Sequence, residues 1–226
     1  MKIILAIGGA VIKTAYDEIK ECARRKKFEV LIHNGGSLFH DFQRATEGEK
    51  LPTDSNSYPL KVLLSHPELN KEASQLVWNY IYSGISPANS LTKICQREKI
   101  EVLMFTGLGC DFWQIFKDAI CWEKLGEVSY LYFEKLCEIM SEPFHYVCLG
   151  SAVIHPEVFT KALSIAKPKE FRTTVVDFLP NQYRPKTRIS VYGEYLCMEH
   201  KEFLRKWLEK EIKIPLVAST LTQDKN

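Results

Sequence analysis

Two neighbouring residues, His40 and Asp41, offer the most specific chemistry in this sequence. They follow a glycine pair in the run Asn34-Gly35-Gly36-Ser37-Leu38-Phe39-His40-Asp41. A helix that begins near Ser37 places both in its first turn, at the mouth of a crevice. There an imidazole can act as acid or base, and a carboxylate can bind ribose hydroxyls or orient the imidazole. The alternative is structural: Asp41 complements the positive end of the helix dipole, and His40 is a polar rim residue.

A second acidic residue, Asp111, follows the run Thr106-Gly107-Leu108-Gly109-Cys110. With Asp41 it makes a candidate carboxylate pair, and capping of the next helix is an equally weighted alternative. Cys110 lacks an activating base in the pattern, which disfavours a nucleophilic role. We therefore predict His40, Asp41 and Asp111 as the catalytic candidates.

Glycines and small polar residues gather where apolar runs end. Glycine lets the backbone approach a ligand closely, and the helix that follows presents free N–H groups to an anion. The alternative is that these glycines only mark tight strand-to-helix turns. The sequence lacks both Gly-x-Gly-x-x-Gly and the P-loop pattern, which disfavours a standard dehydrogenase or NTPase. The predicted cofactor-binding residues share a position directly after such a run: Gly8, Gly9, Asn34, Gly35, Gly36, Thr106, Gly107, Gly109, Gly150 and Ser151.

A further polar cluster contains Tyr183 and Arg184. A guanidinium binds phosphate in bidentate fashion, so this pair is predicted to contact an anionic substrate; a structural loop with Arg184 in a salt bridge is the equal alternative. The histidines show no metal-ligand spacing, and no metal site is predicted.

Five short runs rich in β-branched, aliphatic and aromatic residues are typical of buried strands, and segments of helical period separate them. This alternation predicts an α/β fold, a Rossmann-like three-layer sandwich with a mostly parallel sheet. The strands of a parallel sheet end at one edge, so the glycine loops describe one site. The expected strands are Lys2–Ile7, Glu29–Ile32, Glu101–Phe105, His145–Leu149 and Arg172–Asp177.

The patterns between these strands predict the helices and the limits of the domain. Thr14 is predicted to cap one helix, and Pro156 to lie in the first turn of another. We expect one ligand-binding domain over residues 1–212, a polar loop near 48–60 that is a possible lid, and a C-terminal tail over 213–226. The other expected helical stretches are 68–82, 87–98, 112–125, 130–140 and 201–212.

Composition narrows the class of protein. The 30 basic and 28 acidic residues give a net charge of +2, so charge implies no nucleic-acid partner. Seven cysteines, without a Cys-x-x-Cys pair, indicate reduced thiols. The first apolar run is too short for a signal peptide or a membrane span, so the expected location is the cytoplasm, without a membrane partner.

Four motifs occur in this order along the chain: Gly9-Ala10-Val11-Ile12-Lys13, the Asn34 to Phe42 loop, Gly150 to Phe159, and Asp177-Phe178 with Tyr183-Arg184-Pro185. Together they resemble a little-characterised bacterial family related to deoxyhypusine synthase. The resemblance implies a Rossmann-type fold that binds NAD in a crevice between strand ends, with subunits often packed around the site. No motif matches the lysine-bearing motif of the synthase, so deoxyhypusine synthase activity is not expected.

These observations support more than one function. The first is an NAD-binding transferase or oxidoreductase acting on a small-molecule ligand. The second is a non-catalytic sensor or assembly protein that holds a nucleotide or sugar phosphate, and the third a phosphosugar isomerase. The sequence leaves open whether the protein is an enzyme, and a homo-oligomer is possible.

Overall fold

A computed structural model describes residues 1–47, 67–106, 121–212 and 214. In this part of the chain six strands form one sheet, ordered β3-β2-β1-β4-β5-β6, and every neighbouring pair is parallel. The expected Rossmann-like α/β fold is therefore confirmed. The strands are β1 (Lys2–Ile7), β2 (Val30–Asn34), β3 (Glu101–Phe105), β4 (Phe144–Leu149), β5 (Phe171–Asp177) and β6 (Gly193–Cys197).

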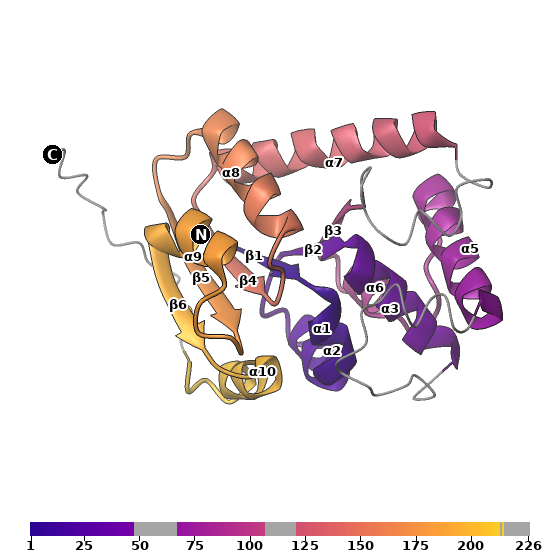
Figure 1. The fold of residues 1–226 in the computed structure, drawn as a ribbon, viewed down its shortest axis with the longest axis horizontal. Coiled ribbons are helices and arrows are strands. Elements are labelled where there is room, and N and C mark those ends of the chain that lie inside the picture. The colour runs from indigo at the N-terminus through magenta and orange to yellow at the C-terminus, as the bar shows by residue number, and fades with distance from the viewer. Residues whose placement is uncertain (48–66, 107–120, 213, 215–226) are drawn as a thin grey trace, which may run out of the picture.

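Helices cover both faces of this sheet. Figure 1 shows α7 and α8 on one side, and α1, α2 and α10 on the other. The helical elements are α1 (Gly9–Thr14), α2 (Tyr16–Arg24), α3 (Gly35–Glu47), α5 (Pro67–Ser83), α6 (Leu91–Arg97), α7 (Trp122–Ser141), α8 (Ile154–Ala166), α9 (Tyr183–Arg188), the 3-10 turn η2 (Ser190–Tyr192) and α10 (His200–Leu208).

The side chains of β1 alternate between the two faces of the sheet and contribute to two separate hydrophobic cores. Ile3, Leu5 and Ile7 pack toward α2, α6 and α10, whereas Ile4 and Ala6 pack toward α7 and α8. Successive side chains of a strand point to opposite faces, so a strand covered on both sides reads as a continuous apolar run. A third cluster joins α3, α5 and the start of α7 beyond the β3 edge of the sheet.

Some expected boundaries differ from the structure. Thr14 ends α1, and α2 begins after Ala15, so Thr14 does not cap the longer helix. Ser90, whose hydroxyl accepts from the Lys93 N–H, caps α6, so the expected helix 87–98 is shorter. The strand β6 was not expected.

The remaining expectations fall partly outside the described residues. The polar loop near 48–60, most of the helical stretch 112–125 and the tail after 212 lie there, apart from residue 214. Stretch 130–140 belongs to the longer helix α7, and Pro156 lies in the first turn of α8 as expected. No helix in the described part of the chain is long and apolar enough to cross a membrane.

Candidate functional site

The strand order reverses between β1 and β4, and two glycines meet there. A Cβ on Gly8, which follows β1, would lie 2.0 Å from the carbonyl oxygen of Gly150, which follows β4. Gly150 itself has φ +61°, in the left-handed region that glycine adopts without steric cost. The carboxyl ends of β1 and β4 therefore come together at the point where open α/β sheets form a ligand crevice.

The turn after β2 is fixed by a reciprocal cap. The Ser37 N–H donates to Asn34 Oδ1 at 2.8 Å, and the Asn34 N–H donates to Ser37 Oγ at 3.0 Å. Asn34 is thus the N-cap of α3, which begins at Gly35 rather than near Ser37. The Asn34 amide also donates to Ser151 Oγ at 3.4 Å, which joins the β2 and β4 loops.

The two predicted glycine pairs lie against each other. A Cβ on Gly9 would lie 3.3 Å from the carbonyl carbon of Gly36 and 3.2 Å from His40 Cδ2, so α1 and α3 pack closely at their beginnings. A Cβ on Gly36 would meet Asn34 Oδ1 only at 3.6 Å, which is ordinary contact. Gly9, Asn34 and Gly36 are half-buried, so the structure brings these predicted cofactor residues together at one edge of the sheet.

Asp41 is placed differently from the expectation. Its side chain is fully buried, and its two oxygens accept four hydrogen bonds: from the Leu91 N–H at 2.6 Å, the Thr92 N–H at 2.9 Å, the Thr92 hydroxyl at 2.7 Å and the Tyr16 hydroxyl at 2.8 Å. Burial raises the pKa of this carboxyl, and the hydrogen bonds act against the rise. Asp41 therefore holds the N-terminus of α6. It falls in the second turn of α3 and not, as expected for a residue open to a ligand, in the first turn.

His40 is also buried. Its Nδ1 lies 3.2 Å from Gln43 Oε1, and burial, followed by the charges of Lys13 and Arg44, lowers its pKa to about 4. The imidazole is neutral at physiological pH. Its buried place beside Gly9 differs both from the expected position at the mouth of a crevice and from the alternative of a polar rim residue.

Three other histidines surround the junction of β1, β2 and β4. His33 Nδ1 lies 3.0 Å from Ser37 Oγ, and His155 Nε2 lies 2.9 Å from the carbonyl oxygen of Ile7. Burial lowers the pKa of His33 to about 3 and that of His155 to about 4. A Cβ on Gly150 would lie 2.6 Å from Cε1 of His200.

No site role was expected from the sequence for His155, His200 or Asp177, although His155 and Asp177 lie within motifs of the family resemblance. Asp177 ends β5, accepts from the Leu179 N–H at 2.9 Å, and has a pKa that burial raises. His200 begins α10, about fifty residues after Gly150 in the chain. No spacing pattern links these residues, since only the tertiary fold brings them to one edge.

The other predicted residues are separate or lie outside the described part. Asp111, Gly107 and Gly109 lie outside it, and Thr106 is buried at the end of β3. Arg184 pairs with Glu157 of α8 at 3.8 Å, and Tyr183 is 74% exposed. The structure therefore favours the salt-bridge interpretation of Arg184.

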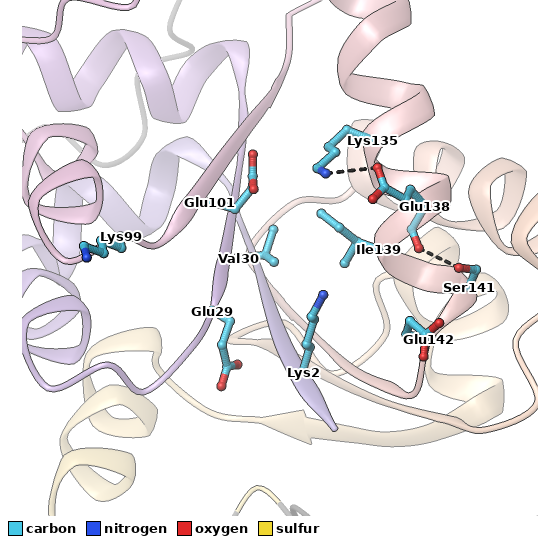
Figure 2. Close-up of a pocket in the computed structure, with 10 residues that line it drawn as sticks. All are labelled: Lys2, Glu29, Val30, Lys99, Glu101, Lys135, Glu138, Ile139, Ser141 and Glu142. Atoms are coloured by element: carbon cyan, nitrogen blue, oxygen red, sulfur yellow. Dashed lines mark hydrogen bonds and ion pairs between the residues drawn. The ribbon is translucent and has the colours of Figure 1, made fainter.

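A hollow on the opposite edge of the sheet is lined by charged side chains. Figure 2 shows Lys2, Glu29 and Glu101 at the amino ends of their strands, and Lys135 and Glu138 on α7. Lys135 and Glu138 pair at 2.9 Å, and the Ile3 N–H donates to Glu29 Oε2 at 2.7 Å. These charges partly satisfy one another, and the hollow lies far from the strand ends where α/β folds hold ligands, so we do not assign it as the site.

In the described residues, no group of three or more His, Cys, Asp or Glu is arranged to hold a metal ion.

Comparison with known proteins shows which solved structures share this fold. No family model matches the chain, and no curated protein does. AgrE, solved in a ternary complex with ornithine and NAD+, aligns with a TM-score of 0.60 and 15% identity over 93% of this chain and 30% of its own. A conserved candidate LOR/SDH protein from Methanococcus maripaludis S2 aligns with a TM-score of 0.59 and 13% identity over 92% of this chain and 60% of its own.

A deoxyhypusine synthase candidate from Entamoeba histolytica is also similar. It aligns with a TM-score of 0.53 and 10% identity over 92% of this chain and 74% of its own. This likeness is one of fold, and it agrees with the Rossmann-type fold that the motif resemblance implies. At such identities the comparisons show a shared Rossmann-like fold, and this chain spans only part of the length of each of these proteins.

Proposed function

We propose that this protein binds NAD or a related dinucleotide across the carboxyl edge of its sheet. The observation that carries the proposal is the reversal of strand order between β1 and β4, where Gly8 and Gly150 meet. Open α/β sheets bind dinucleotides in the crevice at such a reversal. Gly8, Gly9, Asn34, Gly36, Gly150 and Ser151 are the proposed cofactor residues near it.

The beginning of α3 supplies the polar groups for a pyrophosphate. The first N–H groups of a helix have no partner within the helix, and its dipole favours an anion there. Here the Asn34–Ser37 cap holds this turn in place before any ligand arrives. The neighbour AgrE, which shares the fold, was solved with NAD+.

Calorimetric titration with NAD+ and NADH tests the proposal. Gly36→Ala is the matched probe, because the free protein has room for the methyl group, 3.6 Å from Asn34 Oδ1. A pyrophosphate lying against this turn would contact that methyl, so we expect affinity to fall about tenfold. Gly126→Ala, at a position on α7 with no atom within 4 Å of the added Cβ, is the control and should bind like the wild type. Absence of binding by NAD+, NADH and NADP+ at millimolar concentration would refute the proposal, and unchanged affinity in Gly36→Ala would refute the position.

A second function, ligand binding without turnover, is favoured by the state of the two catalytic candidates. The Asp41 oxygens are occupied by α6 and Tyr16, and the His40 imidazole is buried and neutral. Neither group is arranged for acid or base catalysis at the crevice.

Nicotinamide absorbance, followed with NAD+ and a panel of amino acids, polyamines and sugar alcohols, separates the two functions. Turnover that is lost in His40→Gln, while dinucleotide affinity is kept, would restore the transferase or oxidoreductase hypothesis.

A further inference from the structure

The end of β2 lacks a free carboxylate. In dinucleotide-binding folds an acidic residue near this position binds the 2′-hydroxyl of the adenosine ribose, whereas a nearby cation accommodates a 2′-phosphate. Here Asn34 is the last residue of β2, and its side chain is bonded to the Ser37 N–H and to Ser151. It therefore offers no charge to a ribose diol.

The nearest acidic residues already accept hydrogen bonds from other parts of the protein. Glu29 precedes β2 at the opposite edge of the sheet, where its Oε2 accepts from the Ile3 N–H. Asp41 is fully buried, and both its oxygens are occupied. From Val30 to Thr46, no described carboxylate is available to a ligand at this edge.

A cation lies beside the same glycines. Lys13 is on α1, one helical turn after Gly9, and Gly9 packs on Gly36 and His40 of α3; we call these four residues the α1–α3 seam. The Lys13 side chain is half-buried, and in the described part of the chain its ammonium makes no ion pair. Burial lowers the pKa of Lys13. A partly desolvated ammonium without a counter-ion is costly, and a bound anion would offset that cost.

The neighbouring arginine does not fill this role. Arg44 Nη1 donates to the carbonyl oxygens of Ile12 at 2.9 Å and Lys13 at 3.2 Å, and its guanidinium lies 4.8 Å from the centre of the Tyr16 ring. It caps the C-terminal end of α1. Among the described residues, Lys13 is therefore the cation of the seam for which no ion pair is found.

We propose that the site selects a dinucleotide with a phosphate on the adenosine 2′-oxygen, NADP+ or NADPH, and that Lys13 binds this phosphate. The inference rests on the proposed function, since it concerns the same crevice. The seam runs from the Gly9–Gly36 contact to Lys13 over one helical turn, about 5.4 Å. A lysine side chain extends over a distance of this size, so the ammonium can approach a 2′-phosphate on the ribose next to the pyrophosphate at Gly36.

Paired titrations with NAD+ and NADP+ test the selection. We expect NADP+ to bind at least about tenfold more tightly than NAD+ in the wild type. Lys13→Gln should abolish this ratio by weakening NADP+ while leaving NAD+ within about twofold. Lys20→Gln removes the same charge from α2, where Nζ lies 4.5 Å from the Tyr16 ring centre, and should keep the ratio.

A ligand pair provides a test that needs no variant. Adenosine 2′,5′-bisphosphate should compete with NADP+ more strongly than AMP does, by a similar factor. If NAD+ binds as tightly as NADP+, the selection is refuted while the proposed function stands. If Lys13→Gln weakens both dinucleotides equally, the role of Lys13 is refuted. If neither dinucleotide binds, the proposed function itself fails.

Discussion

The two edges of the sheet are built from opposite kinds of contact. At the carboxyl edge, Gly8 and Gly150 touch through their backbones, and Asn34 and Ser151 join two loops by buried or half-buried polar groups. At the amino edge, charged side chains meet in solvent: those of Lys135 and Glu138 are 40% and 70% exposed.

This difference indicates which edge of the sheet can tolerate substitutions. A buried contact between backbones cannot relax when a side chain is added, whereas an exposed ion pair is replaced by water at little cost. We therefore expect substitutions at the carboxyl edge to lower the free energy of unfolding as well as to affect ligand binding. Substitutions at the amino edge should change the free energy of unfolding little.

Acid should produce the largest effect, through the carboxyl edge. His33, His40 and His155 have pKa values of about 3, 4 and 4 in the folded chain, against 6.5 in the unfolded chain. Below pH 6.5 the unfolded chain binds more protons, so the stabilisation present above that pH is lost as the pH falls toward 4. The loss is roughly 2 kcal/mol for each histidine at pH 5. Asp41 and Asp177, whose pKa values burial raises, offset part of it.

Urea denaturation at pH 7 and pH 5 measures this effect. The free energy of unfolding should be lower at pH 5 by several kcal/mol, on the order of the summed histidine contributions. An unchanged value would mean that these imidazoles accept protons without unfolding, and that the carboxyl edge is as solvated as the amino edge.

Gly8→Ala should have the next largest effect. Its methyl would lie 2.0 Å from the Gly150 carbonyl oxygen, so β1 and β4 would have to separate. We expect a loss of about 3 kcal/mol or more in the free energy of unfolding. Gly126→Ala, which meets nothing within 4 Å, should instead stabilise α7 by about 0.5–1 kcal/mol. Equal melting temperatures for the two variants would contradict the tight contact.

Asp41→Ala should destabilise the chain by about 3 kcal/mol. It leaves the N–H groups of Leu91 and Thr92 without their buried acceptor, and the Tyr16 hydroxyl keeps only its longer contacts with the carbonyl oxygens of Asp41 and Asn89, at 3.3 and 3.5 Å. Chemical denaturation measures the loss. A variant as stable as the wild type would show that α6 does not depend on this carboxylate, and would reopen a ligand role for Asp41.

Lys135→Ala should have the smallest effect, below about 0.5 kcal/mol, because the pair with Glu138 is exposed and lies within one helix. The same denaturation measurement applies. A loss comparable to that of Asp41→Ala would remove the contrast between the two edges.

The sequence predicted most of the sheet and only part of the site. Lys2–Ile7 and Glu101–Phe105 agree residue for residue, because strands buried on both faces read as continuous apolar runs. The edge strand β6, Gly-Glu-Tyr-Leu-Cys, was missed because it contains no β-branched residue and is exposed or half-buried along its length. Its strand conformation follows from pairing with β5 rather than from its own pattern.

The expected start of α3 near Ser37 was wrong for a local reason. Asn34 caps α3, so the helix begins at Gly35, two residues before the expected start, and both side chains fall in its second turn. The partners that bury Asp41 come from α2 and α6, fifty residues away in the case of Leu91. No local pattern predicts a contact over that separation.

The hydrogen bond between His155 and Ile7 spans 148 residues, and this has a consequence for folding order. During synthesis β1, β2 and β3 leave the ribosome long before α8 does. At roughly 5–20 residues per second, the interval between Ile7 and His155 is on the order of 10 s. Closing so long a loop also costs entropy before any contact forms. The contacts of Gly8 and His155 at the carboxyl edge are therefore among the last to be assembled, and a nascent chain that stops before β4 carries the first two glycine loops without the strand that completes them.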